Sequence, residues 1–347
     1  MTLFTLTRNL IDIPSVTGEE QAVGDFLAAT LERLGYNVER QQVEGNRFNV
    51  IAGTNTAPRV VLSTHMDTVP PFIASTENDG WIFGRGACDA KGIIAAQIEA
   101  AEQLRHEGVN DIGLLFTVDE ELGSAGARVA NAHPISTECE YLINGEPTDN
   151  KLASATKGSL RLILRTAGRS AHSAYPEQGE SAIEKLLDVL KDIRKLQWPA
   201  DIELGETTCN IGVINGGTRA NVIPDQASAD LQLRLVTGSD AIKSLLEKAI
   251  AGRAQIEYLS VHDPVRLITD SAFEQCVVRF TTDIPYLSRW GKALLIGPGS
   301  ILKAHTAGEC VSKRELQEAV GLYVKLVRSL LRTSHIEADA VAEGVSK

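Results

Sequence analysis

The chain has 347 residues, of which 43% are hydrophobic and 23% are charged, and its formal net charge is −11 at pH 7. This length allows two domains with sizeable cores, and the composition is that of an ordinary globular protein. The negative charge argues against nucleic acid or an anionic membrane as the main partner, because both are polyanions.

The cysteines and the hydropathy of the sequence indicate the cellular compartment. The five cysteines are scattered and no Cys-x-x-Cys pair occurs, which argues against a disulfide framework and a thiolate zinc site. No apolar run approaches the roughly 18 residues of a membrane span, and the N-terminus lacks the features of a signal peptide. We therefore expect a cytoplasmic protein without a membrane-spanning segment.

The first half of the chain predicts helices that alternate with buried strands. One helix is expected to begin near Thr17, with Glu19 and Glu20 in its first turn, and to end at Gly35. Another is predicted from Ala90 to His106. Apolar runs without alternation predict three buried strands, at residues 60–63, 112–118 and 141–144. This order indicates a mostly parallel sheet covered on both faces.

The pattern changes near residue 158. Segments 159–166 and 227–236 alternate strictly between apolar and polar residues, which is typical of an antiparallel sheet with one solvated face. Helices near 180–195 and 239–251 would cover its other face. This region predicts a small α+β domain, at residues 158–265, inserted into the first domain.

The C-terminal part returns to the first pattern, with a buried strand at 292–299 and an amphipathic helix at 313–331. We therefore predict an α/β fold with two domains. Residues 1–157 and 266–347 form a catalytic domain built on the mostly parallel sheet, and residues 158–265 form the inserted domain.

Ligand-type side chains follow each strand predicted for the parallel sheet. The carboxyl ends of parallel strands meet at one edge, where such folds bind ligands. The residues are His65 and Asp67 after the first strand, Asp89 before the helix that follows, Asp119, Glu120 and Glu121 after the second strand, Glu146 after the third and His305 near the C-terminus. The His65–Asp67 pair alone would fit ordinary loop chemistry, but the convergence favours a metal site.

The number of ligands indicates two metal ions. Two histidines and three carboxylates exceed the needs of one tetrahedral zinc ion but suit two divalent ions that share a bridging carboxylate. Two such ions activate a water and polarise a carbonyl group. A carboxylate that binds neither ion can then move the proton of the water to a leaving amine. The Asp-Glu-Glu run at 119–121 supplies adjacent candidates for a base and a ligand.

Seven motifs lie in order along nearly the whole chain. They are HMDTVP, GRGACDAKG, TVDEELGS, NGEPT, SAHSAYPEQGESAI, GGTRANVIPD and GPGSILKAHTAGE. Together they resemble the dizinc amidohydrolase and metallopeptidase family. That family includes acetylornithine deacetylase, succinyl-diaminopimelate desuccinylase, aminoacylase, carboxypeptidases of the G type and several dipeptidases. The resemblance implies hydrolysis of a linear amide bond.

The resemblance also implies roles for the ligand-type residues. One metal ion would be bound by His65, Asp89 and Glu146, and the other by Asp89, Glu121 and His305, so that Asp89 bridges the two. Glu120 would be the general acid and base, and Asp67 would accept a hydrogen bond from the His65 ring. The expected ions are two zinc ions per chain, with cobalt as an alternative.

Further roles are implied for the inserted domain and for one glycine. The family dimerises through this domain, and His172 matches a histidine that reaches into the partner's site to stabilise the oxyanion. Asn221 and Arg234 resemble residues that hold the substrate carboxylate. Gly299 would let the backbone approach the substrate. Each of these residues also has a purely structural alternative. His172 could be a surface histidine, Asn221 could cap a turn and Arg234 could form an exposed salt bridge.

The predicted substrate is an N-acyl amino acid, with N-acetylornithine or a related N-acetyl amino acid of arginine or lysine biosynthesis as the specific expectation. A dipeptidase or carboxypeptidase of the same family, or succinyl-diaminopimelate desuccinylase, is the alternative, because the bond cleaved is an amide in each case. A non-catalytic metal-dependent binding protein is a remote alternative, since such a protein has no need of Glu120.

Overall fold

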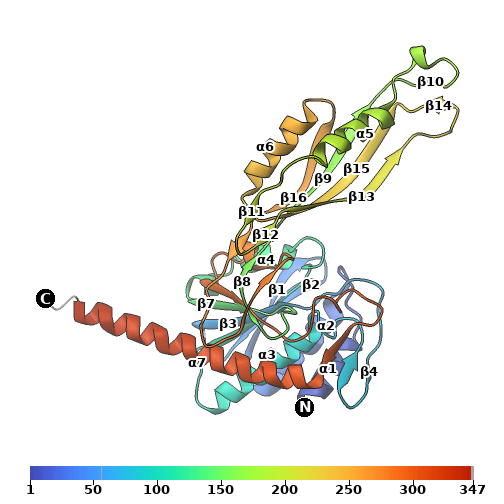
Figure 1. Cartoon of the computed structure of the whole chain (residues 1–347). Helices are drawn as coiled ribbons and strands as arrows, with labels where there is room; N and C mark the ends of the chain where they lie inside the picture. The colour runs from blue at the N-terminus through green and yellow to red at the C-terminus, as the bar shows by residue number, and fades with distance from the viewer. Residues whose placement is uncertain (56, 345–347) are drawn as a thin grey trace. The chain divides into compact units, whose positions relative to one another are not determined.

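The computed structural model describes residues 1–55 and 57–344, with side-chain surroundings up to residue 332. The chain forms two compact units, which Figure 1 shows with their elements labelled. Unit 1 contains residues 1–154, 267–276 and those from 282 onward, and unit 2 contains residues 155–266 and 277–281. Within the described residues, no helix is both long and apolar enough to cross a membrane. The predicted α/β fold class is confirmed.

A six-stranded sheet in the order β1-β2-β6-β3-β7-β19 forms the centre of unit 1. The strands are β1 Asn37–Glu44, β2 Arg47–Gly53, β6 Ile112–Thr117, β3 Val60–His65, β7 Tyr141–Asn144 and β19 Lys292–Leu295. The last four in this order run parallel, as predicted. β1 and β2 add an antiparallel hairpin at one edge. This hairpin was not predicted, because β1 is largely polar and has no regular apolar spacing.

Alternate residues of these strands face two different layers, because successive side chains of a strand point to opposite faces. On one face Leu62 and Ile143 share a core with α1, α2, α3 and α7. On the other face Val61 and Leu142 pack with α4 and the buried Trp290. The helices are α1 Leu3–Ile11, α2 Gln21–Leu34, α3 Lys91–His106, α4 Ala125–Ala130 and α7 Lys313–Gly344.

Two helix boundaries differ from the prediction. α2 begins at Gln21 and has no side-chain cap. The expected start near Thr17 is wrong, because the Thr17 hydroxyl bonds to Asp67 instead. Gly35 ends α2 in the left-handed conformation, as predicted. α7 is longer than predicted and continues to Gly344, through a stretch rich in alanine and glutamate, which favour helix.

Shorter elements complete unit 1 and its connections. They are η1 Pro134–Thr137, η3 Ile284–Tyr286, and a small sheet of β20 Cys310–Ser312, β5 Trp81–Phe83 and β4 Thr76–Glu77. A second small sheet consists of β17 Val265–Arg266, β8 Leu152–Thr156 and β18 Gln275–Val278. The chain passes from one unit to the other in or next to these three strands.

Unit 2 is built on a four-stranded antiparallel sheet in the order β13-β15-β9-β16. Leu162 and Leu231 pair across β9 and β15, and both are buried against α5 and α6. Arg161 and Asp230, on the opposite face, form an ion pair at 2.7 Å. This alternation is the pattern that the sequence predicted for an antiparallel sheet with one solvated face.

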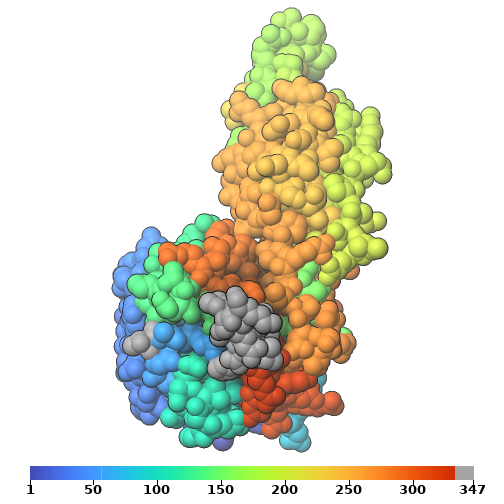
Figure 2. Space-filling view, turned by 90° about the vertical axis from the view of Figure 1, so that its left-hand side faces the viewer, coloured from blue at the N-terminus to red at the C-terminus, as the bar shows by residue number. Residues whose placement is uncertain are grey.

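The elements of unit 2 are β9 Gly158–Ala167, β10 Ala171–His172, η2 Pro176–Gln178, α5 Ala182–Ile193, β11 Ala200–Asp201, β12 Gly205–Glu206, β13 Thr208–Gly216, β14 Val222–Ile223, β15 Gln226–Leu235, α6 Ser239–Ile250 and β16 Gln255–His262. α5 packs on β9, β15 and α6. Figure 2 shows the outer side of α6, in orange, on the surface of this unit.

Candidate metal centre

The predicted metal ligands of unit 1 lie where parallel strands end. His65 is the last residue of β3, and the turn with Glu120 and Glu121 begins just after β6. Glu146 comes two residues after the end of β7. Since β6, β3 and β7 are neighbours that run the same way, their carboxyl ends bring these side chains to one edge of the sheet.

The Asp89 carboxylate lies between the two predicted histidine ligands. Its Oδ1 is 2.9 Å from His65 Nε2, and its Oδ2 is 3.3 Å from His305 Nε2. The same His305 nitrogen lies 2.9 Å from Glu121 Oε1. Ligand atoms of His65, Asp89 and Glu121 all lie within 4.8 Å of one another. A carboxylate with one oxygen toward each histidine has the arrangement that a bridging ligand needs.

The contacts of His65 Nδ1 determine whether Nε2 carries a proton or a free lone pair. His65 Nδ1 is 3.0 Å from the Asp67 carbonyl oxygen and 3.4 Å from Asp67 Oδ1. Nδ1 therefore carries the proton, so Nε2 of the neutral ring would direct its lone pair at the Asp89 carboxylate. That contact requires a positive charge, which is either a second ring proton or a metal ion. The main-chain oxygen of Asp67 is closer to the ring than the predicted carboxylate.

The Asp67 carboxylate has a further task that the sequence did not suggest. Asp67 is completely buried, and its oxygens accept the main-chain N–H groups of Glu120 and Glu121, both at 3.1 Å. The Thr17 hydroxyl donates to it at 2.8 Å. Although burial opposes ionisation, the bond to His65 and the other donors lower the Asp67 pKa. Asp67 thus ties the end of β3 to the acidic turn.

Glu146 and Glu120 are carboxyl groups of the site whose surroundings oppose ionisation in the metal-free chain. Glu146 is 4% exposed, and its Oε1 has no hydrogen-bond partner among the described residues. Burial raises the pKa of Glu146 well above its usual range. Burial, and then the charge of Glu146, raise the pKa of Glu120 in the same way. A buried carboxylate oxygen without a donor fits a metal ligand, since a cation would supply the missing partner.

Gly299 and Glu309, on either side of His305, attach its loop to the segment that contains Cys88 and Asp89. Gly299 adopts a left-handed φ of 88°, and a Cβ there would lie 2.5 Å from the Cβ of Cys88, so packing accounts for this glycine. Its contact with substrate stays a prediction. Glu309, which is buried, accepts the N–H groups of Cys88 and Asp89 at 3.3 Å and an Arg85 N–H at 2.6 Å.

Three predicted residues, His172, Asn221 and Arg234, lie in unit 2, whereas the ligands described above lie in unit 1. His172 is exposed, and its Nδ1 accepts the Ala174 N–H at 3.1 Å. Asn221 is exposed, and its main-chain carbonyl oxygen accepts the Ser173 N–H at 3.0 Å. Arg234 is half-buried in β15 and forms no ion pair or hydrogen bond through its side chain with any described residue.

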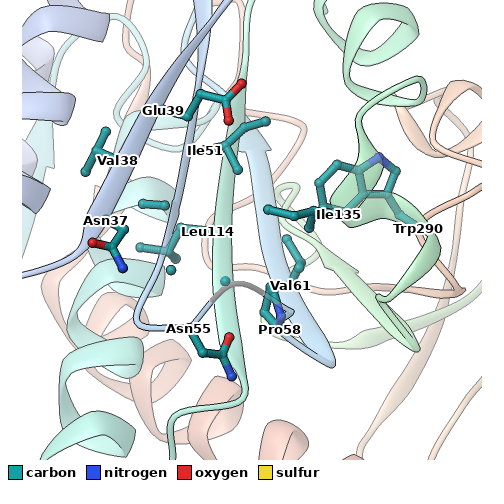
Figure 3. Close-up of a pocket in the computed structure, with 13 residues that line it drawn as sticks. Asn37, Val38, Glu39, Ile51, Asn55, Pro58, Val61, Leu114, Ile135 and Trp290 are labelled. Carbon is teal, nitrogen blue, oxygen red and sulfur yellow. The ribbon is translucent and has the colours of Figure 1, made fainter.

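Unit 1 also contains a cavity that is separate from the candidate metal centre. This cavity of about 330 Å³ is lined in part by Val61, Ile135 and Trp290, whose side chains are drawn in Figure 3. Val61 is near the first residue of β3, whereas His65 is the last residue of that strand. The cavity therefore lies toward the opposite end of β3 from the candidate metal centre.

Comparisons with known proteins identify the family to which the chain is similar. A family model described as peptidase family M20/M25/M40 matches residues 61–329. A probable carboxypeptidase of Emericella nidulans is 38% identical over 377 residues, which cover 94% of this chain and 89% of that protein. A peptidase M20 domain-containing protein of Schizosaccharomyces pombe is 38% identical over 341 residues, covering 95% of this chain and 85% of that protein.

Solved structures with a similar fold are more distant in sequence. An aminopeptidase of Bacillus cereus has a TM-score of 0.76 at 22% identity, covering 93% of this chain and 96% of its own. An M20 metallo-carboxypeptidase of Sulfolobus solfataricus has a TM-score of 0.74 at 19% identity, covering 93% and 97%. A dinuclear metal-binding peptidase of Bacillus subtilis has a TM-score of 0.71 at 16% identity, covering 95% and 98%.

The metal-free protein is expected to lose stability as the pH rises from about 5 to about 7. The pKa values of Glu120 and Glu146 are raised above the usual 4.5, so the folded state holds these protons more tightly than the unfolded state. Their contribution is complete below about pH 4.5 and is lost as the pH rises toward the folded values. Lys91, with a pKa lowered by burial to about 7, acts in the opposite direction above this window.

Urea unfolding at about pH 5 and about pH 7, with a chelator, measures this effect. We expect the free energy of unfolding to be lower at pH 7 by on the order of 1 kcal/mol. With a divalent ion bound, the decrease should shrink, because the ion takes the place of the protons. A metal-free protein that is more stable at pH 7 than at pH 5 would contradict the electrostatics described for the site.

Proposed function

Because this chain belongs to peptidase family M20/M25/M40 and is a metal-dependent hydrolase of amide bonds, we propose that it is a two-metal carboxypeptidase, which removes a residue from the carboxyl terminus of a peptide. The probable carboxypeptidases among its relatives support this proposal. The more specific prediction of an N-acetylornithine substrate has no support among those relatives.

The position of Asp89 carries the two-metal part of the proposal. Each of its oxygens faces a different histidine, and Glu121 lies beside the second of these histidines. We infer that His65, Asp89 and Glu146 hold one ion and that Asp89, Glu121 and His305 hold the other. Nitrogen and carboxylate donors suit zinc, which is the proposed ion, and cobalt is an alternative. When bound, two such ions activate a water and polarise the scissile carbonyl.

Glu120 is the residue proposed to move the proton. It belongs to the same turn as Glu121, and the charges of Glu146 and His65 both act on its carboxylate. A carboxylate that binds neither ion is free to accept a proton. Glu120 takes a proton from the attacking water and then gives that proton to the leaving amine. Asp67 holds the Glu120 main chain in place for both transfers.

Unit 2 is proposed to recognise the substrate. Arg234 is half-buried and has no side-chain partner among the described residues. An unpaired guanidinium is suited to bind a carboxylate through two hydrogen bonds, as a carboxypeptidase requires for the free carboxyl terminus. This observation favours substrate binding over the salt bridge considered for Arg234. We propose Asn221 as a further contact to the same carboxylate.

His172 is proposed to stabilise the oxyanion. Its Nδ1 accepts the N–H of Ala174, so the neutral ring carries its proton on Nε2. That N–H is available to donate a hydrogen bond to the oxygen on which negative charge develops. We propose further that the protein is a homodimer formed through unit 2 and that His172 serves the site of the partner subunit.

Removal of metal should abolish peptide hydrolysis, and about two zinc or cobalt ions per chain should restore it. The assay is a panel of dipeptides, longer peptides with free or amidated carboxyl termini, and N-acetylornithine. We expect hydrolysis of free-carboxyl peptides and little activity on amidated peptides. Full activity in verified metal-free protein would contradict the mechanism. A preference for N-acetylornithine would contradict the carboxypeptidase assignment while leaving the mechanism intact.

Glu120→Gln should lower kcat by about 10²–10⁴-fold or more, because glutamine keeps the size of the side chain but cannot transfer a proton. Metal content, measured by elemental analysis, should stay near that of the wild type. Glu19→Gln, at an exposed position outside the site, is the matched control and should keep full turnover. Near-normal turnover of Glu120→Gln would show that the base is another residue.

His172→Ala should lower kcat by about 10²–10³-fold, the usual loss for an oxyanion donor. Mixing it with Glu120→Gln tests whether His172 acts across subunits. In a mixed dimer one site would carry both changes and the other neither, so activity should partly return after subunit exchange. Each variant mixed with itself is the control. No recovery in dimers shown to be mixed would place His172 in its own subunit's site or remove it from catalysis.

A further inference from the structure

The turn that carries Glu120 and Glu121 has hydrogen bonds of its own, from the N–H groups of Gly123 and Ser124 to the Asp119 carbonyl oxygen. It connects β6 to α4, and two of its residues have left-handed backbone conformations, Asp119 with φ 70° and Ser124 with φ 54°. Residues other than glycine adopt this region at a cost, and contacts from outside the turn help to offset it. Asp67 supplies two such contacts near the middle of the turn, at the N–H groups of Glu120 and Glu121.

A second carboxylate lies beside both ends of this turn. Asp283, which precedes η3, accepts the hydroxyl of Thr117 through Oδ2 at 2.8 Å. The side chain of Ser124 lies beside the same carboxylate and acts to lower its pKa. Thr117 is the last residue of β6, and Ser124 immediately precedes α4. Asp283 therefore anchors the turn where it leaves β6, from a segment that lies more than a hundred residues later in the chain.

The position of Asp283 is unfavourable by itself. Asp283 is 2% exposed, and its Oδ1 has no hydrogen-bond partner among the described residues. Burial raises the pKa of Asp283 to about 6, although Thr117 and Ser124 act to lower it. Its charge also adds to the repulsion at Glu120 and Glu146. Stability of the fold alone does not account for a buried carboxylate here, beside others of like charge.

We propose that Asp283 is a positioning residue of the active site, which fixes the Glu120–Glu121 turn through its hydrogen bond to Thr117. This inference rests on the proposed roles of Glu120 as base and Glu121 as ligand. Asp67 fixes the main chain of the turn from just after β3, and Asp283 fixes its start, at Thr117, from the segment before η3. A displacement of about 1 Å at a catalytic group costs on the order of 10²-fold in rate, so loss of either anchor lowers turnover.

Four variants test the proposal. Asp283→Ala removes both acceptor oxygens, and Asp283→Asn keeps one acceptor oxygen without the charge. Thr117→Val removes one donor at nearly constant shape. Asp270→Ala is the matched control, because Asp270 in unit 1 also accepts a side-chain hydroxyl, that of Ser329 at 2.7 Å, and a main-chain N–H, that of Ala272 at 2.8 Å.

We expect Asp283→Ala to lower kcat by about 10–100-fold with KM changed less than about threefold. Asp283→Asn should recover most of that loss, and Thr117→Val should lower kcat by a smaller factor in the same direction. Asp270→Ala should keep the wild-type kcat even where its melting temperature falls. Thr117→Val keeps the test decisive if Asp283→Ala does not fold.

A readout that needs no substrate separates this inference from the proposed function. The visible absorption spectrum of the Co²⁺-loaded protein reports the geometry of the bound ions, and Asp283→Ala should alter it while Asp270→Ala should not. A wild-type protein that hydrolyses no tested amide would overturn the function, whereas the spectrum would still test the turn. Wild-type kcat and an unchanged spectrum in Asp283→Ala would overturn the inference, as would an Asp283→Asn variant no more active than Asp283→Ala.

Discussion

The collection of negative charge at one edge of the unit 1 sheet is the constraint on which the rest of the site depends. The carboxylates gathered there belong to Asp67, Asp89, Glu120, Glu121, Glu146 and Asp283. Burial alone makes such a cluster strongly unfavourable, and mutual repulsion adds to the cost. The structure meets this cost in two ways, since some of the carboxylates are satisfied by hydrogen bonds within the chain and others are left to be satisfied by cations.

The carboxylates satisfied by the chain form the frame of the site. Asp67 accepts two main-chain N–H groups and a hydroxyl, and Asp283 accepts the hydroxyl of Thr117. Glu309 accepts the N–H of Asp89 and pairs with the buried Arg85. These contacts connect segments far apart in the sequence, and each fixes the backbone of a proposed ligand or of the proposed base. Such bonds orient ligands before any ion is bound.

The remaining groups have the opposite property, because they face one another without a donor. Glu146 Oε1 has no partner among the described residues, and one nitrogen of His305 lies beside both Asp89 and Glu121. Burial raises the pKa of Glu146, and the carboxylates of Asp89 and Glu121 raise the pKa of His305, so both groups favour their protonated forms in the metal-free chain. The same arrangement accepts divalent ions, so metal binding and proton release at this edge are linked.

The sequence by itself determined the parallel strands and the residues that follow them. Apolar runs such as 112–117 and 141–144 identify the buried strands, and the carboxyl ends of parallel strands share one edge, which is enough to group His65, Glu121 and Glu146. The alternating segments of unit 2 are equally readable, because one solvated face imposes a period of two. These features depend on short-range patterns, which a sequence displays directly.

Only the tertiary structure decided which of the other polar residues support the site. Thr17 has the pattern of a helix cap, yet its hydroxyl serves Asp67, 50 residues away. Asp283 bonds to a threonine 166 residues away, and Glu309 to a main chain 220 residues away. Neither acidic residue has a local pattern that distinguishes it from a solvated aspartate or glutamate. The partner of a hydrogen bond between distant segments is set by how the chain folds back on itself, and no spacing along the sequence records it.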